Sequence, residues 1–161
     1  MRSLTTYRSN WGGTSDKPEL SQQNWNLLAI PAIVLAVMAV LQVISFGKFK
    51  DWLDGAGVGW PAVVAVVVII AELWGAVSLL QINLGRVWRW LGLTLAVLVS
   101  GFWFVENITQ ATNGRITEAP SSGLFGRYLT QMPGWWTVVE VSLLLFWVVY
   151  AAELLKWRSD R

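Results

Sequence analysis

The chain has 161 residues, of which 55% are hydrophobic and only 14% are charged, whereas a soluble domain carries about 25% charged residues. This balance predicts a polytopic membrane protein. The chain contains no cysteine and no histidine, which excludes disulfides, thiol nucleophiles, Cys/His zinc sites, iron–sulfur clusters and the usual haem ligation. The net charge is only +2 and the basic residues are dispersed, so nucleic acid is not an expected partner.

The first 25 residues are polar and predict a cytoplasmic tail outside the bilayer. A single transmembrane domain is expected over residues 26–157, followed by a short cytoplasmic end at residues 158–161. Four apolar runs are each long enough to cross a hydrocarbon core of about 30 Å as a helix. They predict spans at about 27–46, 61–80, 87–108 and 135–155. The expected fold class is therefore all-α, an antiparallel four-transmembrane-helix bundle.

Two connections on the outer side predict short interfacial helices. The segment KFKDWLD separates Phe49, Trp52 and Leu53 from its charged residues, as is typical of a helix that lies on a membrane surface. In the longer connection, 107–133, the first half is polar and expected to be irregular, and the second half (SSGLFGRYLTQMP) predicts the other interfacial helix. The inner connection, QINLGRVWRW, is tight and makes the second and third spans antiparallel neighbours.

Lysine and arginine predict the orientation in the membrane. Of the 12 such residues, eight lie on the side that holds both termini and four on the other side. Because cytoplasmic loops carry the excess of positive charge, both termini are expected in the cytoplasm of a cell whose cytoplasmic membrane holds the protein.

Glu72 is the most informative residue, because it lies in the middle of the second apolar run. A carboxylate at that depth costs about 2.5–3.5 kcal/mol on insertion scales, so an acid there needs a partner, a proton or a water-filled cavity. Gln42, Glu106 and Glu140 are expected nearer the outer ends of their helices. Together the four residues predict a polar vestibule that opens to the outside, with Glu72 at its floor.

Such a site has two interpretations, and the residues leave both open. In the functional one, Glu72 moves a proton or hydrogen-bonds the polar head of a bound quinone or lipid, with Trp74 and Trp103 offering ring faces. In the structural one, a protonated Glu72 bonds a serine, a threonine or a backbone carbonyl and fixes the helix register. No metal and no covalently bound cofactor is expected, and the catalytic residues are unknown.

Small residues predict where helices pack closely. Gly92, Ala96 and Ser100 recur every four residues on the third span, and Gly75 lies beside Glu72 on the second. Such stripes let two helix backbones approach each other, and packing within the chain is favoured over a partner-binding face. The tryptophan pairs at 88/90 and 135/136 are most simply interfacial anchors.

The stretch from Lys48 to about Leu98 resembles the DoxX/DoxD family of small four-helix membrane proteins, to which the MauE-type proteins are related. The shared order is a short amphipathic helix, a glycine-rich approach to a proline (GAGVGWP), and an apolar helix holding Glu72 and Gly75. A tight turn with Arg86 and a third helix with Gly92 follow. The resemblance implies a four-helix bundle in a prokaryotic cytoplasmic membrane.

Members of that family are associated with quinone-linked oxidation of thiosulfate, with detoxification complexes or with maturation of periplasmic dehydrogenases. The resemblance therefore implies an integral membrane subunit that works with other membrane or redox subunits. The chain departs from MauE-type redox partners in having no cysteine, so a thiol relay is not expected. Its segment 107–133 has no match in the resemblance.

Three functions follow from these observations. The first is a DoxX-like subunit of a membrane redox or quinone-linked complex, without a redox centre of its own and so a non-catalytic subunit rather than a complete enzyme. The second is a purely structural accessory subunit of a larger complex, such as a respiratory assembly. The third is a small proton-coupled transporter, and it is the weakest because no broken helix or inverted repeat is evident.

Overall fold

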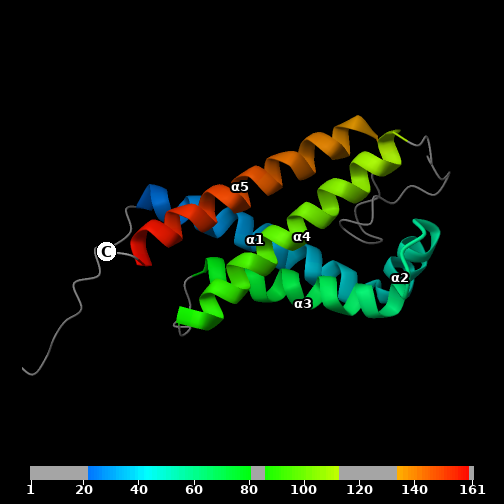
Figure 1. Cartoon of the computed structure of the whole chain (residues 1–161), viewed down its shortest axis with the longest axis horizontal. Helices are drawn as coiled ribbons and strands as arrows, with labels where there is room; N and C mark the ends of the chain where they lie inside the picture. The colour runs from blue at the N-terminus through cyan, green and yellow to red at the C-terminus, as the bar shows by residue number, and fades with distance from the viewer. Residues whose placement is uncertain (1–21, 81–85, 113–133, 160–161) are drawn as a thin grey trace, which may run out of the picture.

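The computed structural model of the chain describes residues 22–80, 86–112 and 134–159 (Figure 1). Residues 1–21 of the predicted cytoplasmic tail and the predicted interfacial helix over residues 121–133 lie outside these ranges, whereas residues 22–25, also assigned to the tail, are already helical. The described residues are helical apart from short turns, and they contain no strand. The fold class is therefore the predicted one.

Four long helices correspond to the four predicted spans. They are α1 (Gln22–Ile44), α3 (Pro61–Leu79), α4 (Arg86–Thr112) and α5 (Trp135–Ser159). Each contains a stretch long and apolar enough to cross a membrane. The short helix α2 (Phe46–Gly55) lies between α1 and α3, so the helix predicted around KFKDWLD is confirmed.

The third span was predicted too short. Residues 107–112 were expected to be irregular, but they continue α4 to Thr112. Their polar side chains are compatible with a helix because Asn107 and Thr112 donate hydrogen bonds to the backbone carbonyls of Trp103 and Ile108, each one turn earlier. Residues 107–112 contain no glycine and no proline.

The helices follow one another around an antiparallel bundle (Figure 1). Helix α3 packs along both α1 and α4, α4 packs along α5, and a smaller contact between α5 and α1 closes the ring. We call the end of the bundle formed by α2, the end of α4 and the start of α5 the α2 end. The opposite end holds the starts of α1 and α4 and the end of α5.

Helix α2 is amphipathic and covers the bundle at the α2 end. Phe49 and Leu53 are buried against the core, while Lys48, Asp51 and Asp54 are exposed. The turn that follows brings the chain into α3, and Pro61 occupies the first turn of that helix, where the missing N–H costs nothing. Trp60, just before it, has a φ of 59°, a left-handed conformation that is uncommon for a bulky residue.

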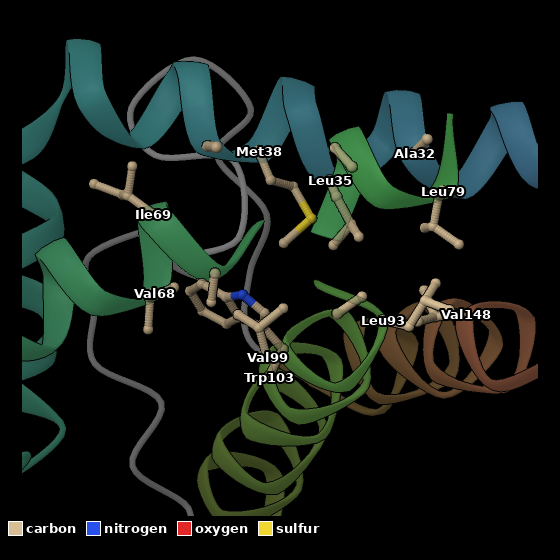
Figure 2. Close-up of a cluster of buried hydrophobic side chains, with 14 of the residues drawn as sticks. Ala32, Leu35, Met38, Val68, Ile69, Leu79, Leu93, Val99, Trp103 and Val148 are labelled. Atoms are coloured by element: carbon tan, nitrogen blue, oxygen red, sulfur yellow. The ribbon is translucent and has the colours of Figure 1, made fainter. Parts of the chain in front are cut away.

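The middle of the bundle is filled by apolar side chains from three helices. Figure 2 shows Leu35 and Met38 of α1 directed toward Val68 and Ile69 of α3 and toward Val99 and Trp103 of α4, and all six belong to one buried cluster. Exposed apolar side chains such as Ile33, Val66, Ile70, Leu143 and Phe146 cover the outside. This distribution fits a bundle whose solvent is lipid.

The predicted small-residue stripes lie between α3 and α4. A Cβ atom added to Gly75 would come within 2.8 Å of the Cβ of Ala96. One added to Gly92 would overlap the hydroxyl of Ser78 and lie 2.7 Å from Cδ1 of Trp74. Gly75, Gly92 and Ala96 therefore lie at the close contact between α3 and α4.

Candidate polar site in the bundle interior

Glu72 is completely buried, with 0% of its surface exposed. It lies eleven residues after Pro61 and seven before Leu79, the two ends of α3. At 1.5 Å per residue, the carboxyl group is held about 16 Å from one end of the helix and about 10 Å from the other. The helix carries no other charged residue, so Glu72 is isolated along the chain and its partners must come from other helices.

Two neighbouring helices supply hydrogen-bond donors to Glu72. Trp103 of α4 donates its indole Nε1–H to Oε1 of Glu72 across 2.7 Å. Gln42 of α1 donates its Nε2–H to the same oxygen across 3.1 Å. The three side chains, which we call the Glu72 cluster, are all buried and join α1, α3 and α4. The other carboxyl oxygen, Oε2, has no hydrogen-bond donor among the described residues.

The packing of α3 on α4 explains why Trp103 reaches Glu72. Gly75 faces Ala96 and Ser78 faces Gly92, so in an antiparallel pair Glu72 is level with Val99. Trp103 lies one turn beyond Val99, and long side chains on a helix lean back toward its N-terminus. The indole therefore returns to the level of the carboxyl group.

Two aromatic side chains of helix α2 pack against this indole. The rings of Phe49 and Trp52 lie 5.8 Å and 5.5 Å from the Trp103 ring. Phe102 meets the same indole edge-on at 5.4 Å. Aromatic contacts of this kind contribute about 0.5–1.5 kcal/mol each beyond their buried area, so the orientation of the Trp103 N–H is fixed by α2 as well as by α4.

The surroundings of Glu72 favour an uncharged carboxyl group. No lysine or arginine of the described chain forms an ion pair with it; the ion pair that the described residues do show, Lys50 with Asp51, is on exposed side chains of α2. Burying an unpaired carboxylate in an apolar interior is far more costly than burying the acid. Because Oε1 already accepts two hydrogen bonds, the proton belongs on Oε2. That hydroxyl is then a donor available to a ligand or a water molecule.

The predicted site residues separate into two groups. The structure brings Gln42, Glu72 and Trp103 together in one cluster, whereas Trp74 donates its indole N–H to the backbone carbonyl of Trp88, 3.2 Å away. The rings of Trp74 and Trp88 also lie 5.6 Å apart in a tilted arrangement. Trp74 therefore contacts the start of α4, and of the two tryptophans predicted beside Glu72 it is Trp103 that bonds Glu72. That either ring meets a ligand stays a prediction.

The two outer acids lie nearer the α2 end. Glu106 is half-buried in α4, and no hydrogen bond or ion pair joins it to Glu72 within the described chain. Glu140 is half-buried near the start of α5. A vestibule that unites both with Glu72 stays a prediction.

The structural interpretation named the wrong kind of partner for Glu72. It expected a serine, a threonine or a backbone carbonyl, but Thr94 is exposed and the hydroxyl of Ser100 donates to the carbonyl of Ala96. The burial of Asn107 was not predicted from the sequence. This residue lies one turn after Trp103, on the face of α4 that carries Ala96 and Ser100. Its spacing of four residues from Trp103 was the signal that could have revealed it.

Comparison of the chain with protein-family models, with curated proteins and with solved structures gives no match. The class that fold and site define is a multi-pass helical membrane protein, a four-helix bundle with a carboxyl group buried in its interior. The DoxX/DoxD resemblance of residues 48–98 stays a prediction.

Proposed function

We propose that this protein is a DoxX-like integral membrane subunit of a redox or quinone-linked complex, and that the Glu72 cluster is its polar ligand site. One observation carries the proposal. Glu72 is fully buried, its Oε1 is held by two N–H donors, and its Oε2 has no donor among the described residues. A side chain fixed on one oxygen and available on the other is suited to binding.

The chemistry of the cluster favours a ligand with a carbonyl oxygen and a flat ring. An uncharged Glu72 offers an O–H donor from Oε2, and a carbonyl oxygen is its natural acceptor. The indole of Trp103, which bonds Glu72, is packed against Phe49 and Trp52, so the cluster has aromatic neighbours. A quinone head combines both properties, and a lipid ester carbonyl shares the first.

The residue types support a subunit rather than a complete enzyme. A chain without cysteine and histidine lacks the ligands that usually hold a haem, an iron–sulfur cluster or a zinc ion. The redox centre of such a complex would belong to a partner subunit. We further propose, from the distribution of lysine and arginine, that the protein lies in the cytoplasmic membrane with both termini in the cytoplasm.

The test compares the wild-type protein with a triple variant, Gln42→Leu/Glu72→Leu/Trp103→Phe. Removing the donors together with the acceptor leaves no orphaned N–H, so the bundle keeps its fold. Each protein is isolated in lipid nanodiscs cut directly from the membrane, and retained quinone and co-purifying proteins are measured by mass spectrometry. Decylubiquinone serves as the added probe in a binding titration.

We expect the triple variant to lose at least nine-tenths of the retained quinone and to bind decylubiquinone at least tenfold more weakly. Glu153→Leu, a change of an exposed acid on α5, is the matched control and should behave as wild type. Equal quinone content and equal affinity in the triple variant would refute the ligand site. A Glu72→Gln variant keeps both an acceptor and a donor, so it should retain the probe while losing the exchangeable proton.

A second candidate is a purely structural accessory subunit. The observation that favours it is that the Glu72 cluster links three helices in a fully buried position, as a polar network that fixes helix register would do. On this reading the triple variant retains its partner proteins, and no quinone is recovered from wild type either. The same mass spectrometry therefore separates the two candidates.

A further inference from the structure

One face of α4 continues from the Glu72 cluster toward the α2 end. Trp103, Asn107 and Gln110 follow one another at spacings of four and three residues, so they lie on the same side of the helix. They are 0%, 1% and 9% exposed. Val105 and Thr109, between them in sequence, are exposed, which confirms that this polar stripe faces inward and not toward lipid.

Asn107 carries a second acceptor that the protein does not satisfy. Its amide Nδ2–H donates to the backbone carbonyl of Trp103 at 2.9 Å, while its Oδ1 has no donor among the described residues. An unsatisfied buried acceptor costs about 1–3 kcal/mol, and buried water is the usual way in which proteins meet that need. Trp103 thus contacts Asn107 through its backbone and Glu72 through its indole.

The two unsatisfied groups are complementary. An uncharged Glu72 offers a donor on Oε2, and Asn107 offers an acceptor on Oδ1. A water molecule has two donors and can accept as well. Water in this region would accept from Glu72 and donate toward Asn107, and Gln110 continues the polar lining toward the α2 end.

The other half of the bundle has no comparable polar stripe. There the interior is filled by apolar side chains from four helices, namely Leu28, Ala32, Leu79, Leu93, Ala96, Val148, Ala151 and Leu155. Figure 2 shows Ala32, Leu79, Leu93 and Val148 gathered in this region. Among the described residues, Ser78 is buried in this half and its hydroxyl has no hydrogen-bond partner, but it is a single polar group packed against Gly92 and no buried polar side chain continues from it toward the end of the bundle. We call this apolar half the dry half.

From this asymmetry we infer that water and protons reach Glu72 from the α2 end alone, along the face of α4 that carries Trp103, Asn107 and Gln110. The inference rests on the site in the proposed function but concerns access to it. Asn107 is a positioning residue for water in this route, and Trp103 is hydrogen-bonded to both Asn107 and Glu72.

The absence of cysteine makes single-cysteine labelling a direct test. Asn107→Cys and Gln110→Cys probe the route, and Ala96→Cys and Ala151→Cys, both at fully buried positions, are the controls in the dry half. Asp54→Cys and Glu153→Cys, at exposed positions on opposite ends, mark the two sides of sealed vesicles. The reagent is a membrane-impermeant, positively charged methanethiosulfonate added outside or inside.

We expect Asn107→Cys and Gln110→Cys to react at least tenfold faster than the two alanine-site controls, and only from the side that labels Asp54→Cys. Reaction as slow as in the controls, or reaction from the side that labels Glu153→Cys, would overturn the inference. Labelling is independent of any ligand. A positive labelling pattern with unchanged quinone binding in the triple variant would refute the proposed function and leave the access route intact.

A second measurement avoids the cysteine variants altogether. Exchange of the Trp103 indole N–H with solvent is followed by NMR on ¹⁵N-tryptophan-labelled protein, with the signal assigned by Trp103→Phe. We expect Asn107→Leu, which keeps the branching and number of side-chain heavy atoms without polar groups, to slow this exchange at least tenfold. The indole of Trp147 in the same spectra, which donates to Leu27 near the opposite end, should be unaffected. An unchanged Trp103 exchange rate in Asn107→Leu would count against the route.

Discussion

Trp103 and Glu72 are joined by an indole N–H that donates to a carboxyl oxygen across 2.7 Å, in a part of the bundle where neither residue has any exposed surface. The bond connects α4 to α3, and Gln42 connects α1 to the same oxygen. One carboxyl group therefore ties together three of the four long helices.

Truncation of Glu72 should destabilise the bundle more than its amide replacement does. Glu72→Ala leaves a cavity and removes the acceptor from two buried N–H donors, so we expect a loss of about 3 kcal/mol in the free energy of unfolding. Glu72→Gln keeps an acceptor oxygen and should cost less than about 1 kcal/mol. Reversible unfolding in mixed detergent micelles measures both, and equal losses in the two variants would contradict the hydrogen-bond assignment.

The Trp103–Glu72 bond should appear as a coupling energy. A double-mutant cycle with Trp103→Phe and Glu72→Leu removes the N–H and the acceptor separately and together. Hydrogen bonds between membrane helices couple by about 0.6–1.7 kcal/mol, and we expect a value in this range because the geometry is short and fully buried. In the control cycle, a substitution of Phe102 takes the place of Trp103→Phe. The Phe102 side chain has no hydrogen bond to lose. Simple additivity for Trp103 would show that the bond contributes nothing.

The close approach of α3 and α4 should make two glycines sensitive to a single methyl group. Gly75→Ala and Gly92→Ala each force a Cβ atom against α4 or α3, with contacts of 2.8 Å or less to Ala96 and Ser78, so a loss of about 1–3 kcal/mol is expected. Gly101→Ala meets nothing within 4 Å and should be neutral or stabilising by up to about 1 kcal/mol through helix propensity. Thermal unfolding followed by size exclusion ranks the three variants.

A second substitution, made in each alanine variant, distinguishes the contact at Gly75 from the contact at Gly92. Ser78→Gly should rescue most of the loss in Gly92→Ala, because it removes the hydroxyl that the new methyl group would overlap and leaves only the contact of 2.7 Å with Cδ1 of Trp74. The Cβ atom added by Gly75→Ala would also lie 3.0 Å from the backbone Cα of Ala96. Ala96→Gly keeps that Cα atom, so it should rescue Gly75→Ala only in part. Full rescue of both, or of neither, would contradict the geometry of this interface.

One tryptophan of α5 is hydrogen-bonded to α1. Trp147 donates its indole N–H to the backbone carbonyl of Leu27 at 2.9 Å, at the end of the bundle opposite to α2. Trp147→Phe should reduce the stability by about 0.6–1.7 kcal/mol and raise amide hydrogen exchange in the first turns of α1. Trp136→Phe, a change at a residue that is 71% exposed, is the matched control and should alter neither quantity.

Much of the fold could be predicted from the sequence because the spans are set by local composition. An apolar run of about 20 residues can satisfy its backbone groups in a membrane only as a helix, so the positions of α1, α3, α4 and α5 follow from the chain itself. The close packing at Gly75 and Gly92 could also be predicted, since small residues spaced by four mark a close contact, but their partners on the other helix could not. The extension of α4 to Thr112 was missed because polarity suggested a loop, although side chains can satisfy helix carbonyls there.

Within the candidate site, the sequence determined that Glu72 is the costly residue of the membrane interior and that no other chemistry-bearing type competes with it, because cysteine and histidine are missing. It did not determine the partners of Glu72. Whether Gln42, Trp103 or a serine meets the carboxyl group depends on helix rotation and register to within a few ångströms, and these are set by packing between helices far apart in the chain. Only the tertiary structure decided that Trp103 and Gln42 share one carboxyl oxygen, and that the polar face beyond them, through Asn107, leads toward the α2 end.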